Sequence, residues 1–151
     1  MGTNKAIGTA FESSVIKLLE EAGFTTARRI PLHGALDNGD IWLGSNPTNP
    51  DVIIECKSRK IEVGYKGIED FIKEAHTEYK NAKHIDIVCN RSALVFVKRP
   101  NLGTQDGYII WKNGFDITLR ARIGDIINRN NFLDFYTEEQ RIEKLNLLLS
   151  L

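Results

Sequence analysis

Two acidic residues and a lysine have the types and the spacing of a hydrolytic site. Glu55 and Lys57 end a strongly apolar segment that begins at Val52. Side chains two positions apart lie on the same face of a strand, so a carboxylate and an ammonium group emerge side by side there. Asp40 opens the preceding predicted strand. Antiparallel pairing of the two strands through the loop at 44–50 would bring Asp40 near Glu55 at one edge of the sheet.

These groups suit the hydrolysis of a phosphodiester bond. Two carboxylates and a backbone carbonyl form a set of hard oxygen ligands, which Mg²⁺ prefers. The cation makes an attacking water more acidic and offsets charge on the phosphate. Lys57 could orient or deprotonate that water and stabilise the transition state. An ordinary cross-strand cluster of surface charges explains the spacing equally well.

The surrounding pattern predicts the helices that would position this site. Apolar residues at helical spacing over 7–22 indicate a first helix, which Gly23 would end. An apolar stripe over 68–82, with charged residues opposite it, indicates a second helix. Thr137 and Gln140 have the spacing of a capping box at the start of a C-terminal helix.

Short apolar and β-branched segments predict the strands. The near-continuous apolar run at 52–56 indicates a strand that is buried on both faces. The segment 117–129 is predicted to be helical. The order of helix, three strands, helix, further strands and helical tail predicts an α/β fold with a mixed sheet flanked by helices. Strands are expected at 24–31, 40–43, 52–56, 85–89, 93–97 and 108–111.

The residues around Asp40 and Glu55 resemble the motif of the PD-(D/E)XK nucleases, in which an Asp is followed, one hairpin later, by Glu-X-Lys. Gly39 stands where the motif's name places a Pro. The core of that family (helix, three-stranded meander, helix, strand) matches the predicted order from about residue 5 to residue 98. The resemblance therefore implies a restriction-endonuclease-like fold with a mixed central sheet flanked by helices, extended here by a C-terminal helix. The matching segments are Gly39-Asp40-Ile41 and Ile54-Glu55-Cys56-Lys57.

Within that superfamily the chain most resembles the archaeal-type Holliday junction resolvases. Those enzymes carry a Glu in the first helix, a Gly-Phe after it, an Arg-Ile strand, and then the Asp and the Glu-X-Lys. His33-Gly34 stands where they tend to have a small hydroxyl residue and a Gly. The corresponding residues here are Glu12, Gly23-Phe24, Arg29-Ile30, Asp40 and Glu55-Cys56-Lys57.

The resemblance implies a role for each of these polar residues. Asp40 and Glu55 would hold Mg²⁺, with Mn²⁺ as a substitute, and the backbone carbonyl of Cys56 would be a third ligand. Lys57 would be the catalytic lysine and Glu12 an outer ligand of the metal or of a water. On its own, Glu12 lies at the border of the apolar stripe, where a glutamate is usually solvated. The Cys56 side chain alternates away from Glu55 and Lys57, which predicts a core residue and not a nucleophile.

Basic residues near the predicted site are expected to contact DNA phosphates, with an affinity that falls as salt rises. His33, in a loop close to Asp40, could contact phosphate or water, and an ordinary loop histidine is an equal alternative. The later basic residues would extend the patch or are simply solvated charges. The expected DNA-binding residues are Arg28, Arg29, His33, Arg59 and Lys60, and the later ones are Lys98, Arg99, Arg120, Arg122 and Arg129.

Composition limits the classes of protein that are possible. The chain has 151 residues, which suits one domain, and its 20 Lys and Arg balance its 20 Asp and Glu. This balance excludes a globally basic coat, so DNA must meet a local patch. No apolar run is long enough for a membrane span. The two cysteines are too few for a disulfide framework and predict a reduced, cytoplasmic protein.

The chain is expected to divide into a nuclease core at 1–133 and a C-terminal helix at 134–151, used for packing or dimerisation. The resemblance implies a homodimer, because a four-way junction needs two symmetric cuts. The predicted function is therefore a Mg²⁺-dependent DNA endonuclease that resolves Holliday junctions. Two alternatives remain: a restriction- or repair-type nuclease that cuts duplex DNA, and an inactive DNA-binding subunit with the same fold.

Overall fold

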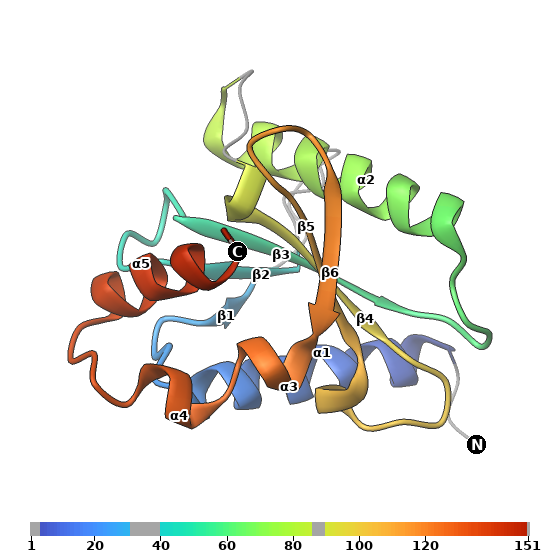
Figure 1. Ribbon diagram of the computed structural model, residues 1–151, viewed down its shortest axis with the longest axis horizontal. Helices are drawn as coiled ribbons and strands as arrows, with labels where there is room; N and C mark the ends of the chain where they lie inside the picture. The colour runs from blue at the N-terminus through green and yellow to red at the C-terminus, as the bar shows by residue number, and fades with distance from the viewer. Residues whose placement is uncertain (1–3, 31–39, 86–89, 151) are drawn as a thin grey trace.

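The computed structural model describes residues 4–30, 40–85 and 90–150 (Figure 1). Its described part forms a sheet of β1 (Arg28–Arg29), β2 (Ile41–Leu43), β3 (Val52–Ser58), β4 (Ala93–Lys98), β5 (Tyr108–Lys112) and β6 (Thr118–Arg122). The helices are α1 (Asn4–Glu21), α2 (Tyr65–Lys83), α3 (Ile123–Ile126), α4 (Arg129–Phe132) and α5 (Glu138–Leu148). None of these helices combines the length and the apolar content needed to cross a bilayer.

The sheet is mixed, as the sequence predicts. Its strands follow the chain order from β1 to β6. Every neighbouring pair is antiparallel except β3 and β4, which are parallel because α2 makes the crossover between them. The predicted hairpin is present: β2 pairs antiparallel with β3, and Ile41 lies opposite Ile54. This pairing places the segment before β2 next to the middle of β3.

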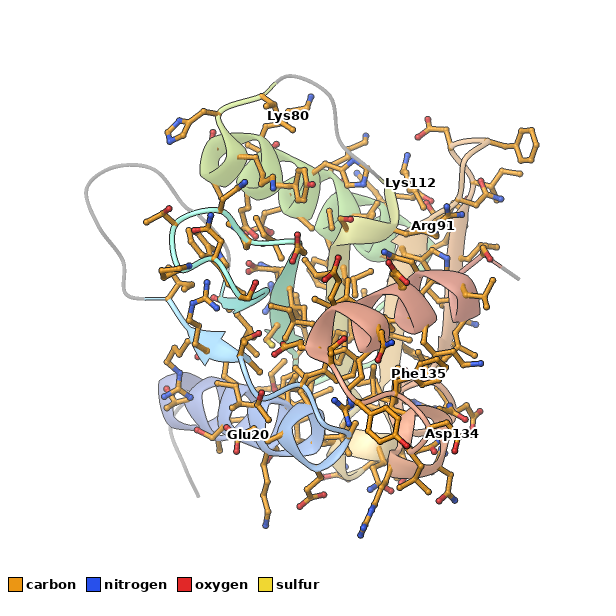
Figure 2. All side chains as sticks on the ribbon, turned by 90° about the vertical axis from the view of Figure 1, so that its left-hand side faces the viewer. Glu20, Lys80, Arg91, Lys112, Asp134 and Phe135 are labelled. Carbon is orange, nitrogen blue, oxygen red and sulfur yellow. The ribbon has the colours of Figure 1, made fainter. Side chains whose placement is uncertain are left out.

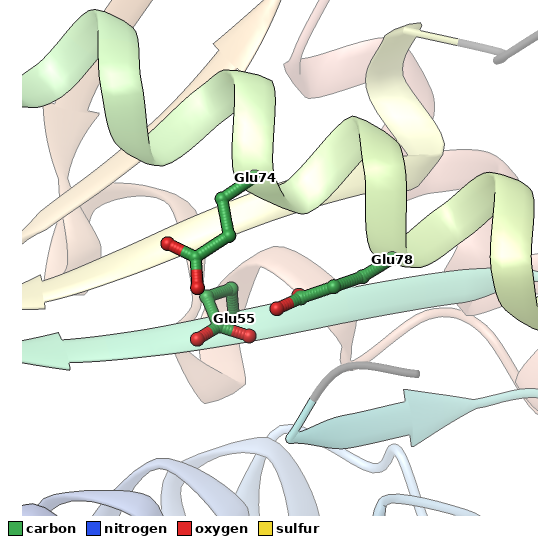
Figure 3. Close-up of side chains that lie close together, drawn as sticks. All are labelled: Glu55, Glu74 and Glu78. Atoms are coloured by element: carbon green, nitrogen blue, oxygen red, sulfur yellow. The ribbon is translucent and has the colours of Figure 1, made fainter. Parts of the chain in front are cut away.

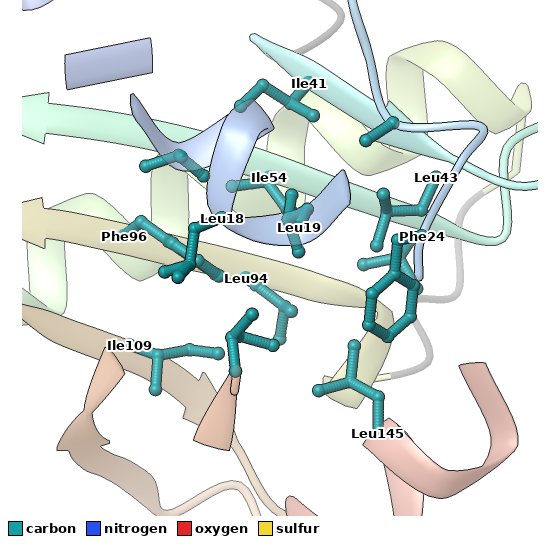
Figure 4. Close-up of a cluster of buried hydrophobic side chains, with 14 of the residues drawn as sticks. Leu18, Leu19, Phe24, Ile41, Leu43, Ile54, Leu94, Phe96, Ile109 and Leu145 are labelled. Carbon is teal, nitrogen blue, oxygen red and sulfur yellow. The ribbon is translucent and has the colours of Figure 1, made fainter. Parts of the chain in front are cut away.

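The sheet lies between helices, with α1 on one face and α2 on the other (Figure 1). An apolar layer fills the space between the sheet and the helices on each face. Val52, Ile53 and Ile54 are fully buried, and they alternate between the two layers. This confirms that β3 is buried on both faces. Figure 4 shows the layer beneath α1, which includes Leu18, Leu19, Phe24, Ile41, Leu43, Ile54, Leu94, Phe96, Ile109 and Leu145.

The C-terminal helix packs on this same layer. Thr137 and Gln140 form the predicted capping box, and Ile142 and Leu145 are buried against the core. The Trp111 indole N–H donates a buried hydrogen bond of 2.7 Å to the carbonyl of Leu149. In Figure 2, α5 faces the viewer, with Asp134 and Phe135 labelled on the segment that leads into it. The apolar stripe of α5 is therefore covered by its own domain.

One predicted helix is wrong. Residues 117–129 contain β6 followed by the short helix α3. The Asn113 side chain accepts hydrogen bonds from the backbone N–H groups of Phe115 and Ile117, which fixes a tight hairpin. β6 then pairs along its whole length with β5, so tertiary pairing overrides the local pattern.

Two smaller differences lie near the N-terminus. Within the described residues 24–30, the strand predicted over 24–31 is reduced to Arg28–Arg29, because Phe24 packs into the core and Thr26 donates its backbone N–H to Glu138. Ile7 is 38% exposed and does not join the buried stripe of α1, which Gly23 ends with a left-handed φ of 98° as predicted. The strand predicted at 85–89 falls largely outside the described residues.

Candidate active site

Glu55 and Lys57 lie side by side on β3 and face α2. Glu55 is only 5% exposed, because strands and the helix above it enclose its side chain. The Lys57 ammonium is 3.1 Å from Glu55 Oε1 and 2.8 Å from Glu74 Oε2. The alternation of a strand produces the first of these contacts, and the packing of α2 on the sheet produces the second. The ammonium group therefore bridges a carboxylate of the sheet and a carboxylate of the helix.

Asp40 immediately precedes β2 and lies against the backbone of the Glu-X-Lys segment. Its own N–H donates to the carbonyl of Ile54, which ties it to β3. The backbone N–H of Cys56 donates a 2.8 Å hydrogen bond to Asp40 Oδ2. A hydrogen bond from a backbone amide stabilises the ionised form of a carboxylate. The hairpin thus holds the Asp40 carboxylate beside the residue that separates Glu55 from Lys57.

Glu12 reaches toward the same region from α1. Its Oε2 is 3.1 Å from Arg29 Nε on β1, and the same guanidinium also donates to Ser13. Partial burial raises the pKa of Glu12, the charge of Arg29 opposes that shift, and the charge of Glu55 adds to it. Glu12 therefore lies within electrostatic reach of Glu55.

The Cys56 side chain points to the opposite face and packs against the layer beneath α1. Burial raises the pKa of its thiol well above the ordinary range, and the charges of Asp40, Glu12 and Glu55 raise it further. The thiol therefore stays protonated, which excludes it as a nucleophile near neutral pH. All three acids therefore lie within electrostatic reach of Cys56.

Two glutamates of α2 complete the acidic cluster, and the sequence analysis missed them. Figure 3 shows Glu74 and Glu78 reaching from α2 toward Glu55. The three side chains can each offer one ligand atom, with all of these atoms within 4.8 Å of one another. Glu78 is only 1% exposed. A signal was present in the sequence, because position 78 lies three residues after Ala75 on the apolar stripe, where a charge is unusual.

Lys57 is held as a cation. Burial lowers the pKa of its ammonium group, but the hydrogen bond to Glu74 and the charge and hydrogen bond of Glu55 outweigh that effect, so the pKa is raised. The ammonium also lies 5.4 Å from the centroid of the Phe71 ring. A lysine in this state can orient a substrate and stabilise negative charge, and it is a poor general base near neutral pH.

The donor atoms fit a divalent cation. Oε2 of Glu55 is buried and has no hydrogen-bond partner among the described atoms. A buried carboxylate oxygen without a partner is costly, and a hard cation is a suitable partner for it. The residues around this oxygen are carboxylates, and the described part of the site offers no imidazole ligand, so the chemistry favours an oxygen-binding metal.

The predicted DNA-binding residues fall into two groups. Arg28 donates to the backbone carbonyls of Thr26, Gly44 and Asn46, and Arg29 is bound to α1, so both guanidinium groups have partners inside the protein. Arg59 and Lys60 are exposed beyond the end of β3, and Arg59 lies over the Phe71 ring that Lys57 also contacts. His33 lies outside the described residues.

Comparison with known proteins agrees with this geometry. A family model described as restriction endonuclease, the Mrr catalytic domain, matches residues 3–99. That range contains Glu12, Asp40, Glu55 and Lys57 together with α1, the first four strands and α2. No curated protein and no solved structure matches the chain. The chain therefore belongs to the restriction endonuclease family, a family of PD-(D/E)XK nucleases that act on DNA.

Proposed function

We propose that this protein is a Mg²⁺-dependent DNA endonuclease whose active site is built around Asp40, Glu55 and Lys57. One observation carries the proposal: the Asp40 carboxylate is bound to the backbone of Cys56, between the acid and the lysine of the Glu-X-Lys segment. Such an arrangement presents carboxylate oxygens and a fixed cation to one phosphodiester.

Each residue of this group has a distinct role. Asp40 and Glu55 would hold the cation, and the carbonyl of Cys56 would be the third protein ligand. When bound, Mg²⁺ or Mn²⁺ offsets the charge of the phosphate and makes an attacking water more acidic. Glu12 lies further out and orients water through its own carboxylate, while Arg29 holds its side chain in place.

Lys57 acts through its charge. Its ammonium group is fixed by Glu55 and Glu74, so it can donate hydrogen bonds to the phosphate without losing side-chain entropy in the reaction. Negative charge grows on the phosphate oxygens as the bond to the attacking oxygen forms. A preorganised ammonium in a half-buried position stabilises that charge more than a solvated one does.

We propose a four-way junction as the substrate and a homodimer as the active form. The ordered set of Glu12 in α1, Asp40 before β2 and Glu55 with Lys57 on β3 supports the junction, since this is the order of the resolvases that the chain resembles. A twofold dimer would place two such sites on the two symmetric strands of a junction. The family description favours a second candidate, which is cleavage of linear duplex DNA.

A cleavage assay separates these possibilities. The protein is incubated with a labelled four-way junction and with a matched linear duplex, in Mg²⁺, in Mn²⁺ and in EDTA. We expect paired nicks in the junction, dependence on the cation, and loss of cleavage in Asp40→Asn and Lys57→Ala. The exposed residues of α2 provide matched controls, Asp70→Asn and Lys73→Ala, which should cleave like the wild type.

The outcomes are distinct. If the linear duplex is cleaved as fast as the junction or faster, duplex DNA replaces the junction as the proposed substrate. Cleavage that persists in EDTA and in both active-site variants would contradict the proposed mechanism. Binding to DNA with no cleavage under any condition would identify an inactive DNA-binding subunit.

A further inference from the structure

Three arginines lie between Lys57 and the strand β6. Arg59 follows β3, Arg99 follows β4, and Arg120 lies in β6. β3 and β4 are parallel with Ser58 opposite Lys98, so Arg59 and Arg99 leave the sheet at the same end. We call these three residues the arginine band.

The arginine band lies on the face of the sheet that carries Lys57. Arg59 is two residues after Lys57, and alternation keeps the two side chains on one face. Arg120 is opposite Ile110, whose side chain belongs to the apolar layer beneath α2. Tyr108 packs against that same layer and lies opposite Val97, near the end of β4. The band therefore shares one face of the sheet with the proposed active site.

The side chains of the arginine band stack on two aromatic rings, those of Phe71 and Tyr108. The Arg59 guanidinium carbon is 5.1 Å from the centroid of the Phe71 ring, which Lys57 also contacts. The guanidinium carbons of Arg99 and Arg120 are 5.1 and 4.8 Å from the centroid of the Tyr108 ring. Stacking of this kind restricts a guanidinium before any ligand arrives, so less entropy is lost on binding.

The band carries an excess of positive charge. Arg99 is paired with Glu62 at 2.9 Å, and both side chains are partly exposed. Within the described ranges, no ion pair forms at Arg59 or at Arg120. Arg59 donates one hydrogen bond to the backbone carbonyl of Ser58, whereas Arg28 donates to three backbone carbonyls and Arg29 is paired with Glu12. Arg59 close to Lys57, and Arg120 three strands further across the sheet, therefore present oriented cations to an anionic ligand.

We infer that the arginine band binds the phosphate backbone of the DNA as it leaves the active site toward β6. Guanidinium groups match the geometry of phosphate oxygens through paired hydrogen bonds. Contacts of this type position the duplex without reading its sequence. The inference rests on the proposed function, since it assigns a path to DNA whose scissile phosphate lies at Lys57.

The test measures DNA binding without cleavage. Affinities of the wild type, Arg120→Gln and the double variant Arg59→Gln/Arg120→Gln are measured by fluorescence anisotropy with a labelled duplex in EDTA, over about 50 to 200 mM salt. Lys17→Gln is the matched control for the loss of one positive charge, because Lys17 is exposed on α1, which covers the other face of the sheet. Circular dichroism checks the fold of each variant.

We expect Arg120→Gln to weaken binding by about threefold to tenfold and the double variant by more, equally for unrelated sequences. The slope of log affinity against log salt should fall by about 0.9 for each arginine removed. Glu62→Gln should tighten binding, because it releases Arg99 from its carboxylate partner. A gain of affinity cannot arise from misfolding.

Other results would overturn the inference. If the wild type binds and cleaves DNA while the band variants match Lys17→Gln in affinity and in slope, the arginine band is not part of the DNA path and the proposed function stands. If the wild type neither binds nor cleaves DNA, both the proposed function and the band are refuted.

Discussion

Glu55 has acidic neighbours on two sides, and the two sides are built differently. On the side of β2, Asp40 is held by a hairpin and by the backbone N–H of Cys56. On the side of α2, Glu74 and Glu78 approach from a helix that follows β3 after the loop at 59–64. Lys57 is joined to Glu55 and to the α2 side through Glu74.

The difference suggests separate roles for the acidic residues on the two sides of Glu55. The β2 side presents a carboxylate fixed by backbone hydrogen bonds, which suits a metal ligand that must keep its geometry. The α2 side engages the lysine, and it raises the pKa of that ammonium group. We therefore expect changes on the β2 side to affect the reaction directly, and changes at Glu74 to act through Lys57.

Replacing Lys57 should have the largest effect, because this residue serves both sides. Lys57→Met should abolish cleavage and lower the free energy of unfolding by about 3 kcal/mol, since it leaves the buried carboxylate of Glu55 without its cation. Chemical denaturation measures the stability, and Lys73→Met is the exposed control on α2. A variant as stable as the control would contradict the pairing.

The pH dependence of this stability has a definite sign. The pKa of Lys57 is raised in the folded protein, so its pairs stabilise the fold fully below the unfolded value of about 10.4. That contribution is lost as the pH rises through the folded pKa. The difference in stability between wild type and Lys57→Met should therefore be constant near neutral pH and shrink only in the alkaline range.

Asp40→Asn should be the next largest change and should act on the β2 side alone. Asparagine can still accept the hydrogen bond from Cys56, so the fold should persist while the carboxylate charge is lost. We expect cleavage to slow by at least about a hundredfold, equivalent to about 2.7 kcal/mol. Single-turnover kinetics measure this loss, and Asp70→Asn controls for the change of residue type. If Asp40→Asn and Asp70→Asn cleave at equal rates, Asp40 has no role in the reaction.

Glu74→Gln should have a smaller effect, which appears in the pH profile. The variant keeps the contact of Lys57 with Glu55 but loses the charge of the helix carboxylate. We expect cleavage to fall by about tenfold. The alkaline loss of activity should move to lower pH, because Glu74 helps to raise the pKa of Lys57. An unchanged profile, with Glu69→Gln as the control, would show that the α2 side does not act on the lysine.

The smallest effect is expected at Glu12. Its ion pair with Arg29 is partly exposed, so Glu12→Gln should change the free energy of unfolding by less than about 1 kcal/mol. Cleavage should slow by only a few-fold if this residue orients water from an outer position. A loss as large as that of Asp40→Asn would move Glu12 from the outer position to that of a direct ligand.

The β2 side could be predicted from sequence because it is local. Asp40 and Glu55 are joined by one hairpin, and the apolar run after Asp51 fixes which residues of β3 are buried. The same local logic predicted the helix α2 and the capping box at Thr137.

The α2 side could not be placed in this way. Whether Glu74 faces Lys57 depends on the rotation and the height of α2 above the sheet, which tertiary packing sets. β6 was missed for a related reason, since its strand exists by pairing with β5. Phe71 and Tyr108 were part of ordinary apolar patterns, and only the fold shows that arginines stack on them.

Glu55 has neighbours on both sides, and we propose that it helps to hold the divalent cation that DNA cleavage requires. Single-turnover cleavage of one labelled DNA, measured across a Mg²⁺ titration for the wild type and for Glu55→Gln, tests it most directly. We predict that the wild-type rate rises with Mg²⁺ to a plateau and vanishes in EDTA, and that the variant is at least about a hundredfold slower at every concentration. Equal rates for the two proteins, or wild-type cleavage that survives EDTA, would contradict the account.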